Sequence, residues 1–243
     1  MPRFSANISM LFKELEFPER FEAAAQAGFK AVEIQFPYSW DKGRLAQIAQ
    51  HAGVEVVLIN MPGGDPEKGD RGIGCLPSRI GEFRDAVGKA IEYARELGCK
   101  QVNCLAGITL PNVDEAKLRE TYVWNLRYAA VELARQGMTL LVEPINTRTI
   151  PGFYLNKSAQ ALALIDEVGA ANLKLQYDLF HMHIMGDDLA TTLSANLARI
   201  GHMQVADVPG RHEPGTGEID FPPLSTGTGC PRLCSWLSAR FTC

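Results

Sequence analysis

The sequence predicts an α/β protein in which short parallel strands alternate with longer helices and close into a (β/α) barrel. Nearly continuous apolar runs, such as VEVVLI and TLLVE, suit strands that are buried on both faces. Amphipathic helical patterns lie between these runs. The chain has 243 residues, which is a usual size for one such barrel. We therefore expect a single domain over residues 1–243.

The apolar runs predict seven strands, at residues 4–8, 31–35, 54–59, 101–105, 139–142, 173–177 and 202–206. Alternation of strand and helix along the whole chain implies a parallel sheet with right-handed crossovers. Seven clear strands and an ambiguous eighth favour a barrel over an open sheet. No G-x-G-x-x-G follows an early strand, which argues against a dinucleotide-binding fold.

Five helices are predicted between the strands, at residues 18–27, 41–52, 79–97, 114–136 and 158–168. The third of these has the clearest apolar stripe, with apolar side chains at steps of three and four residues. Ser78 is its expected N-cap, and Gly98 stands where a C-terminal glycine belongs.

Composition excludes several classes of function. The net charge of −4 lacks the excess of positive charge that is typical of nucleic-acid-binding proteins. No apolar run is long enough to span a bilayer, and the N-terminal MPRFSANISMLF lacks the features of a secretory signal. We therefore expect a cytoplasmic protein without nucleic-acid or membrane partners. None of the six cysteines forms a C-x-x-C pair, so we expect free thiols, several of them buried.

Polar residues at the strand ends predict a site, because the chemistry of such barrels lies at the C-terminal ends of their strands. Glu143 directly follows one apolar strand, and Asp178 follows the next, with His181 three residues on. Gln204 lies in the seventh strand, and Arg211 lies behind it in the loop GRHEPGTGE, which otherwise resembles an ordinary surface turn. Carboxylate and amide oxygens at one mouth suit a divalent cation such as Mg²⁺ or Mn²⁺.

Each of these residues also has a simpler explanation. Glu143 could be a salt-bridge partner, Asp178 could cap the following helix, and Gln204 could be a buried hydrogen-bonding residue. Neighbours two apart do not point alike, so we expect only one of His181 and His183 near the site. The prediction depends on the joint pattern, in which three consecutive strands each offer an oxygen ligand at the same end.

Long segments of the chain resemble a known family. They are RFSANISMLF, NMPGGDPEKGDRGIGCLPSR, NLRYAA, LLVEPINTRTIPGF, LQYDLFHMHIMGDDL and QVADVPGRHEPGTGEIDF. All resemble hydroxypyruvate isomerases, a group that includes 2-oxo-tetronate isomerases within the xylose-isomerase-like barrel superfamily. The resemblance covers about residues 3–224. It implies a (β/α)₈ TIM barrel that interconverts hydroxypyruvate and 2-hydroxy-3-oxopropanoate (tartronate semialdehyde), or a close 2-oxo acid analogue, by metal-assisted enediol proton transfer.

The resemblance also assigns roles. Glu143 matches the family's catalytic, metal-binding glutamate, and Asp178 and Gln204 match further metal ligands. By resemblance to the related ketose epimerases, His181 and Arg211 fall where side chains hold substrate oxygens. The implied cofactor is a divalent metal, Mg²⁺ or alternatively Mn²⁺, and the implied partner is a small hydroxy or oxo acid. Whether copies of the chain form a homo-oligomer is left open.

The last residues depart from the family. Its members end with a strand resembling G-W-V-G-C-E-Y, whose Glu is a second catalytic carboxylate and a fourth metal ligand. Here the tail of residues 225–243 places Trp236 at the motif's Trp and Arg240 at the Glu position. An Arg would repel a cation and cannot act as a base. We therefore expect an irregular or incomplete last β/α unit.

Three explanations of this tail stay open: a sequence error or degenerate gene end, a variant with altered or lost activity, or an eighth strand that is built differently. We favour the first, because the differences are confined to the last residues.

Three other functions compete with the isomerase. A ketose 3-epimerase would use the same mouth, but epimerases usually place a His where Gln204 stands. An endonuclease-like relative would need a basic surface and more metal-binding His, whereas this chain has five His and is acidic. A catalytically impaired barrel that only binds a sugar acid is favoured by Arg240 alone.

Overall fold

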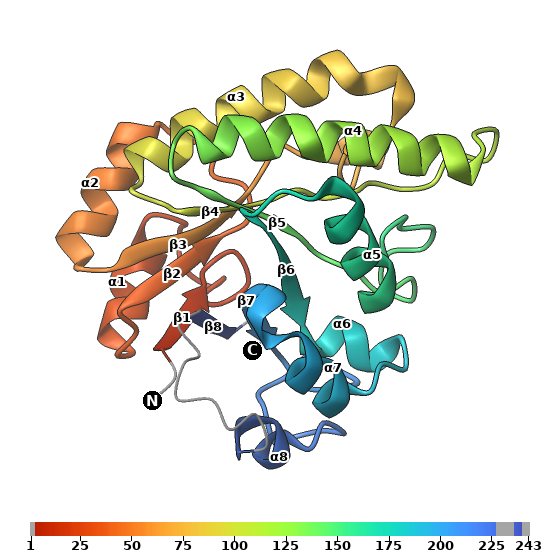
Figure 1. Ribbon diagram of the computed structural model, residues 1–243. Coiled ribbons are helices and arrows are strands. Elements are labelled where there is room, and N and C mark those ends of the chain that lie inside the picture. Colours follow the sequence, from red (N-terminus) through yellow and green to blue (C-terminus); the bar gives the residue numbers. More distant parts are fainter. Residues whose placement is uncertain (1–2, 227–235, 240–243) are drawn as a thin grey trace.

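The computed structural model describes residues 3–226 and 236–239 of the chain, which form a parallel barrel surrounded by helices (Figure 1). Its strands are β1 (Arg3–Asn7), β2 (Ala31–Ile34), β3 (Glu55–Asn60), β4 (Gln101–Asn103), β5 (Thr139–Val142), β6 (Leu173–Asp178), β7 (Ile200–Val205) and β8 (Trp236–Ala239). Each strand pairs in parallel with the next, and β8 pairs with β1 to close the ring. The predicted (β/α)₈ barrel is therefore confirmed.

The helices are α1 (Glu19–Gln26), α2 (Lys42–Ala52), α3 (Ile80–Glu96), α4 (Glu115–Ala134), α5 (Ser158–Val168), α6 (Leu179–Ile184), α7 (Leu189–Asn196) and α8 (Phe221–Thr226). The two long helices α3 and α4 pack side by side on one flank of the barrel (Figure 1). No bounds were predicted from the sequence for α6, α7 or α8, although the possible Asp178 cap anticipated a helix at the position of α6. Within the described part of the chain, no helix is both long enough and apolar enough to cross a bilayer.

Local sequence explains the boundaries of these elements. The strand β2 is buried at every position, as expected of a strand covered on both faces. The helix α2 begins at Asp41, whose side chain accepts from the backbone N–H of Arg44, and it ends at Gly53, which has a φ of 69°. The expected Ser78 cap of α3 is wrong, because a 3₁₀ turn over Pro77–Arg79 leads into that helix and no side chain caps it.

Three cysteines of the described chain, Cys75, Cys99 and Cys104, are buried free thiols, as predicted. Burial raises the pKa of each of these thiols to about 12. They are therefore protonated near neutral pH and act as small apolar core groups, with no nucleophilic role.

The last β/α unit is short, in agreement with the predicted irregular unit. The helix α8 has six residues, and β8 has four. Trp236 pairs with Arg3 of β1, and Ala239 pairs with Val205 of β7, so this short strand closes the sheet on both sides. Arg240, which follows Ala239 in the sequence, lies outside the described residues.

Candidate active site

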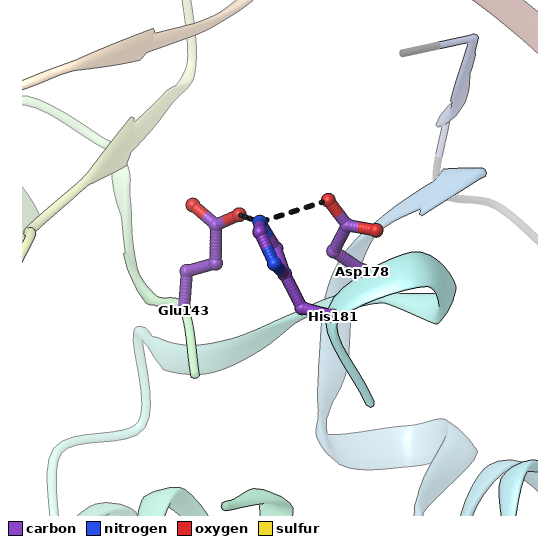
Figure 2. A group of neighbouring side chains, drawn as sticks. All are labelled: Glu143, Asp178 and His181. Carbon is purple, nitrogen blue, oxygen red and sulfur yellow. Dashed lines mark ion pairs between the residues drawn. The ribbon is translucent and has the colours of Figure 1, made fainter. Parts of the chain in front are cut away.

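Two buried carboxylates meet at the C-terminal mouth of the barrel with an imidazole beside them (Figure 2). Glu143 directly follows β5, Asp178 ends β6, and His181 lies in the first turn of α6. Their exposed fractions are only 1%, 0% and 2%. The Nε2 of His181 lies 3.5 Å from Asp178 Oδ2 and 3.9 Å from Glu143 Oε1. The chain thus brings together three of its predicted site residues.

The orientation of His181 is fixed by Asn146, which lies three residues after Glu143. The Oδ1 of Asn146 accepts from the backbone N–H of Thr149 at 2.7 Å, so its amino group faces the imidazole. That amino group lies 2.6 Å from His181 Nδ1, and the backbone N–H of Asn146 also donates to Nδ1 at 3.4 Å. An amide nitrogen only donates, so Nδ1 must be the acceptor and the imidazole proton lies on Nε2. The Nε2–H is therefore directed at the carboxylates.

Glu143 is oriented by an amide on the neighbouring strand. The Nδ2 of Asn103, which ends β4, donates to Glu143 Oε2 at 2.9 Å and to Asn60 Oδ1 at 3.1 Å. Asn103 is fully buried, and its Oδ1 has no hydrogen-bond partner among the described residues. A buried acceptor without a partner is costly in a folded protein, so this oxygen offers a hydrogen-bonding position beside Glu143.

Asp178 has the expected capping role and also pairs with a cation. Its Oδ1 caps α6 by accepting from the backbone N–H of Phe180 at 3.0 Å. Its Oδ2 accepts from Arg211 Nη2 at 2.8 Å, and the Arg211 guanidinium stacks over the Phe180 ring at 4.6 Å. Arg211 therefore lies at the candidate site, and its charge offsets part of the negative charge that two buried carboxylates bring together.

Gln204 lies beside the site, where it belongs to a second buried cluster. It stands opposite Asp178 in the register of β6 and β7. Its Nε2 donates to Glu33 Oε1 at 2.5 Å, and its Oε1 accepts from Gln176 Nε2 at 3.0 Å. The expected buried hydrogen-bonding role is therefore present, and Gln204 stands next to Asp178, the other residue that was predicted to bind the metal.

Glu33 is the centre of that second cluster, inside the barrel. It is 1% exposed. Its Oε1 also accepts from Asn7 Nδ2 at 2.5 Å, and its Oε2 lies 3.0 Å from His202 Nε2. These partners lie in β1 and β7, so barrel strands on two sides hold this carboxylate.

The loop that carries Arg211 is organised by Asp207, which follows β7. The carboxylate of Asp207 accepts from four backbone N–H groups, which belong to Val208, Gly215, Gly217 and Ile219. Burial raises the pKa of Asp207, but these four hydrogen bonds outweigh it and leave the pKa below its usual value. The loop is exposed, as a surface turn would be, yet its backbone is tied to one buried carboxylate.

The donor chemistry of the site fits a metal ion. Glu143, Asp178 and His181 have candidate ligand atoms that lie within 4.8 Å of one another. The two carboxylates supply oxygen ligands, whereas the Nε2 of His181 carries its proton and is placed to donate a hydrogen bond. Buried carboxylate oxygens suit a hard divalent cation, and a cation at this point would offset their mutual repulsion.

Sequence reasoning missed two of the residues that shape the site, Asn146 and Asp207. Each follows a strand end, as Glu143 does, but neither is part of a charged pattern that would have drawn attention. The expectation that only one histidine of HMH lies in the site fits the structure: His183 is partly exposed and pairs with Glu218 at 3.5 Å.

Comparison with known proteins places this barrel in an enzyme family. A family model described as a xylose isomerase-like TIM barrel matches residues 21–226. Hydroxypyruvate isomerase of Escherichia coli K12 is 51% identical over 221 residues, which cover 91% of this chain and 86% of the relative. The 2-oxo-tetronate isomerase of Cupriavidus necator is 45% identical, with 92% and 86% covered.

Solved structures agree on the fold. A crystal structure described as an AP endonuclease of family 2 from Brucella melitensis is 40% identical with a TM-score of 0.95, and the match covers 99% of this chain and 93% of that one. An L-ribulose 3-epimerase at 24% identity has a TM-score of 0.80, with 100% and 82% covered, and this likeness concerns the fold alone.

The fold and the mouth residues define an α/β-barrel enzyme, and the relatives support the predicted isomerase class. The chain belongs to the xylose isomerase-like TIM barrel family.

Proposed function

We propose that this chain interconverts hydroxypyruvate and 2-hydroxy-3-oxopropanoate, or a close analogue such as a four-carbon 2-oxo acid. The observation that carries the proposal is Glu143, a buried carboxylate at the barrel mouth, oriented by Asn103 and facing the Nε2 of His181. The relatives named hydroxypyruvate isomerase and 2-oxo-tetronate isomerase, at 51% and 45% identity, support this substrate class.

The reaction moves one proton between neighbouring carbons. Glu143 removes a proton from C3 of hydroxypyruvate, which gives an enediol, and then returns the proton to C2. The hydroxyl proton on O3 moves to O2 in the same reaction, so that C3 becomes the aldehyde carbon and C2 carries the hydroxyl group. A carboxylate near the reacting carbons can serve first as base and then as acid. The Nε2–H of His181 can donate to the substrate oxygen on which negative charge develops, because Asn146 holds the imidazole in that tautomer.

Glu143 and Asp178, with Gln204 beside them, would hold the metal, for which Mg²⁺ is the first candidate and Mn²⁺ the second. When bound, a divalent ion at this position supplies electrostatic stabilisation of the enediol oxygens. Asp178 is fixed for this task by the first turn of α6, and Arg211, which donates to Asp178, can also hold a substrate oxygen.

The direct test is turnover of hydroxypyruvate by the purified chain with Mg²⁺. In D₂O, proton NMR should show deuterium entering C3 together with the appearance of 2-hydroxy-3-oxopropanoate, both faster than without protein. Absence of both, with Mg²⁺ and with Mn²⁺, would contradict the proposal.

A second candidate function is a barrel that binds a sugar acid without turning it over. The observation in its favour is Arg240, which stands where the resembling family has its second glutamate. The substitution Arg240→Glu separates the two candidates. A large gain in turnover would identify the tail as the defect of an isomerase, whereas tight binding without turnover in both forms would favour the binding protein.

A further inference from the structure

A cavity of about 630 Å³ opens beside the candidate site, over the C-terminal ends of β2 to β5. Its size falls in the range of small-molecule sites, roughly 300–1,000 Å³. Its lining includes Phe36, Tyr38, Asn60, Arg71, Leu105 and Ile145. The lining is largely apolar with a few polar and charged groups, which is typical of a ligand site.

The cavity adjoins the proton-transfer carboxylate. Asn60 lines it, and the Oδ1 of Asn60 accepts from the same Asn103 amino group that donates to Glu143. Ile145 lines it from two residues beyond Glu143, on the same chain segment. A substrate with its reacting carbons at Glu143 could therefore extend one end into this cavity.

Arg71 lines the cavity from a segment that is fixed on both sides. The preceding Asp70 accepts from the backbone N–H of Asp65 and from Arg79 Nη1, each at 2.7 Å. The following Gly72 has a φ of 113° and lies so close to Leu105 that a side chain would collide with its carbonyl oxygen. The backbone position of Arg71 is therefore set by packing as well as by hydrogen bonds.

The charge of Arg71 is not offset by a nearby acid. Its Nη1 donates to the carbonyl oxygens of Asp70 at 2.6 Å and Pro66 at 3.3 Å. Within residues 3–226 and 236–239, no carboxylate lies at salt-bridge distance from Arg71 or from Lys89, a second cation in the lining. The carboxylate of Asp70 is instead paired with Arg79. The cavity thus presents net positive charge.

Arg211, the other cation near the mouth, differs in this respect. It forms an ion pair at 2.8 Å with Asp178, one of the carboxylates proposed to hold the metal. Its charge is engaged there, so it is the weaker candidate for binding a substrate carboxylate.

We propose that this cavity binds the carboxylate end of the substrate, with Arg71 as its partner and Lys89 adding positive potential. An Arg guanidinium can hold a carboxylate through two parallel N–H···O bonds, and Arg71 has donors left for this purpose. The proposal rests on the proposed isomerase function. The cavity also leaves room for a four-carbon 2-oxo acid, since a three-carbon acid displaces only a few waters of about 30 Å³ each.

Calorimetric titration with D-glycerate, a three-carbon hydroxy acid that cannot isomerise, tests this assignment in the Mg²⁺-loaded protein. We expect Arg71→Gln to raise the dissociation constant about tenfold or more, the effect of losing a charge-assisted hydrogen-bonded pair. Arg71→Lys should recover part of the loss. The matched control is Lys68→Gln, which removes a cation from the same segment but lies outside the cavity lining and should change binding less than about twofold.

Steady-state kinetics with hydroxypyruvate adds a second measurement. Arg71→Gln should raise KM about tenfold and change kcat much less, because the lost contact binds substrate and transition state alike. If wild type turns over hydroxypyruvate and Arg71→Gln still binds glycerate normally, the carboxylate site is wrong while the isomerase stands. If wild type shows no turnover but binds glycerate through Arg71, the isomerase is wrong while the carboxylate site stands. A wild-type protein that does not bind glycerate overturns the assignment.

Discussion

Two buried carboxylate clusters lie side by side in this barrel, and they differ in what surrounds them. Around Glu33, the amide group of Asn7 from β1 converges with the amide group of Gln204 and the imidazole of His202 from β7. Around Glu143, the neighbours are a second carboxylate, Asp178, and an imidazole directed at both. In the first cluster, hydrogen-bond donors surround a single carboxylate. In the second cluster, two carboxylates lie close together and concentrate negative charge.

The difference teaches that burial alone does not identify a catalytic carboxylate. Glu33 and Glu143 are equally inaccessible, each 1% exposed. A carboxylate held by several donors is stabilised in its ionised form and serves the fold. Two carboxylates that share a buried position favour a cation and can exchange protons with a substrate. Gln204 belongs to both regions, since it hydrogen-bonds Glu33 and stands opposite Asp178 in the sheet.

The largest expected loss of activity follows a substitution in the cluster of Glu143, Asp178 and His181. Glu143→Gln keeps the side-chain shape and an oxygen that can accept from Asn103, but it removes the base. We expect kcat for hydroxypyruvate to fall about 10²- to 10⁴-fold with little change in thermal stability. Initial rates and a melting curve measure the two quantities. A variant with near-normal kcat would show that the base is another group.

Asp178→Asn should separate the two roles of that residue. Asn is as good an N-cap as Asp, so the variant should unfold at a free energy within about 1 kcal/mol of wild type. It lacks the charge that a cation needs, so Mn²⁺ affinity should fall at least about tenfold. Calorimetric Mn²⁺ titration and urea unfolding give both numbers. Unchanged affinity would remove Asp178 from the ligand set.

Glu33→Gln should lower the stability of the protein more than its activity. The new amide places an N–H among side chains that donate, so we expect a loss of about 2–3 kcal/mol in the free energy of unfolding. Its kcat should fall less than that of Glu143→Gln, because Glu33 is not proposed to touch the reacting carbons. Urea unfolding and kinetics of the same preparation test the contrast. A greater loss of kcat than in Glu143→Gln would reverse the roles of the two clusters.

The smallest effect concerns the loop behind β7. The pKa of Asp207 is lower in the folded protein than in the unfolded chain, so its stabilising contribution is complete above a pH of about 4 and is lost as pH falls through the folded pKa. Asp207→Asn should cost about 1 kcal/mol at neutral pH and weaken the pH dependence of stability on the acid side. Unfolding curves from pH 7 to pH 3 measure both. Identical pH profiles for the two proteins would contradict this account.

The features that the sequence predicted share a physical basis. Strand positions followed from apolar runs, and Glu143 and Asp178 were found because parallel strands bring their C-terminal ends to one mouth. Such inferences need only the order of residues and the fold class.

The features that it did not predict depend on distances across the fold. The contact of His202 with Glu33 joins residues 169 positions apart, and no local pattern indicates it. The control of the His181 tautomer by Asn146 depends on which end of one amide faces the ring. The four hydrogen bonds to Asp207 depend on the path of an exposed loop. Short-range periodicity carries no information on these features.

Ring closure by β8 has a consequence for how the chain is made. The first strand pairs with residues more than two hundred positions later, since Arg3 lies opposite Trp236. At a synthesis rate of about 5–20 residues per second, roughly 10–50 seconds pass between the synthesis of β1 and the synthesis of β8, its last partner strand. During that interval β1 presents an open edge to other chains, as β7 does once it has been made, and an open strand edge is a template for aggregation. The four residues of β8 therefore protect the newly made protein as well as complete its barrel.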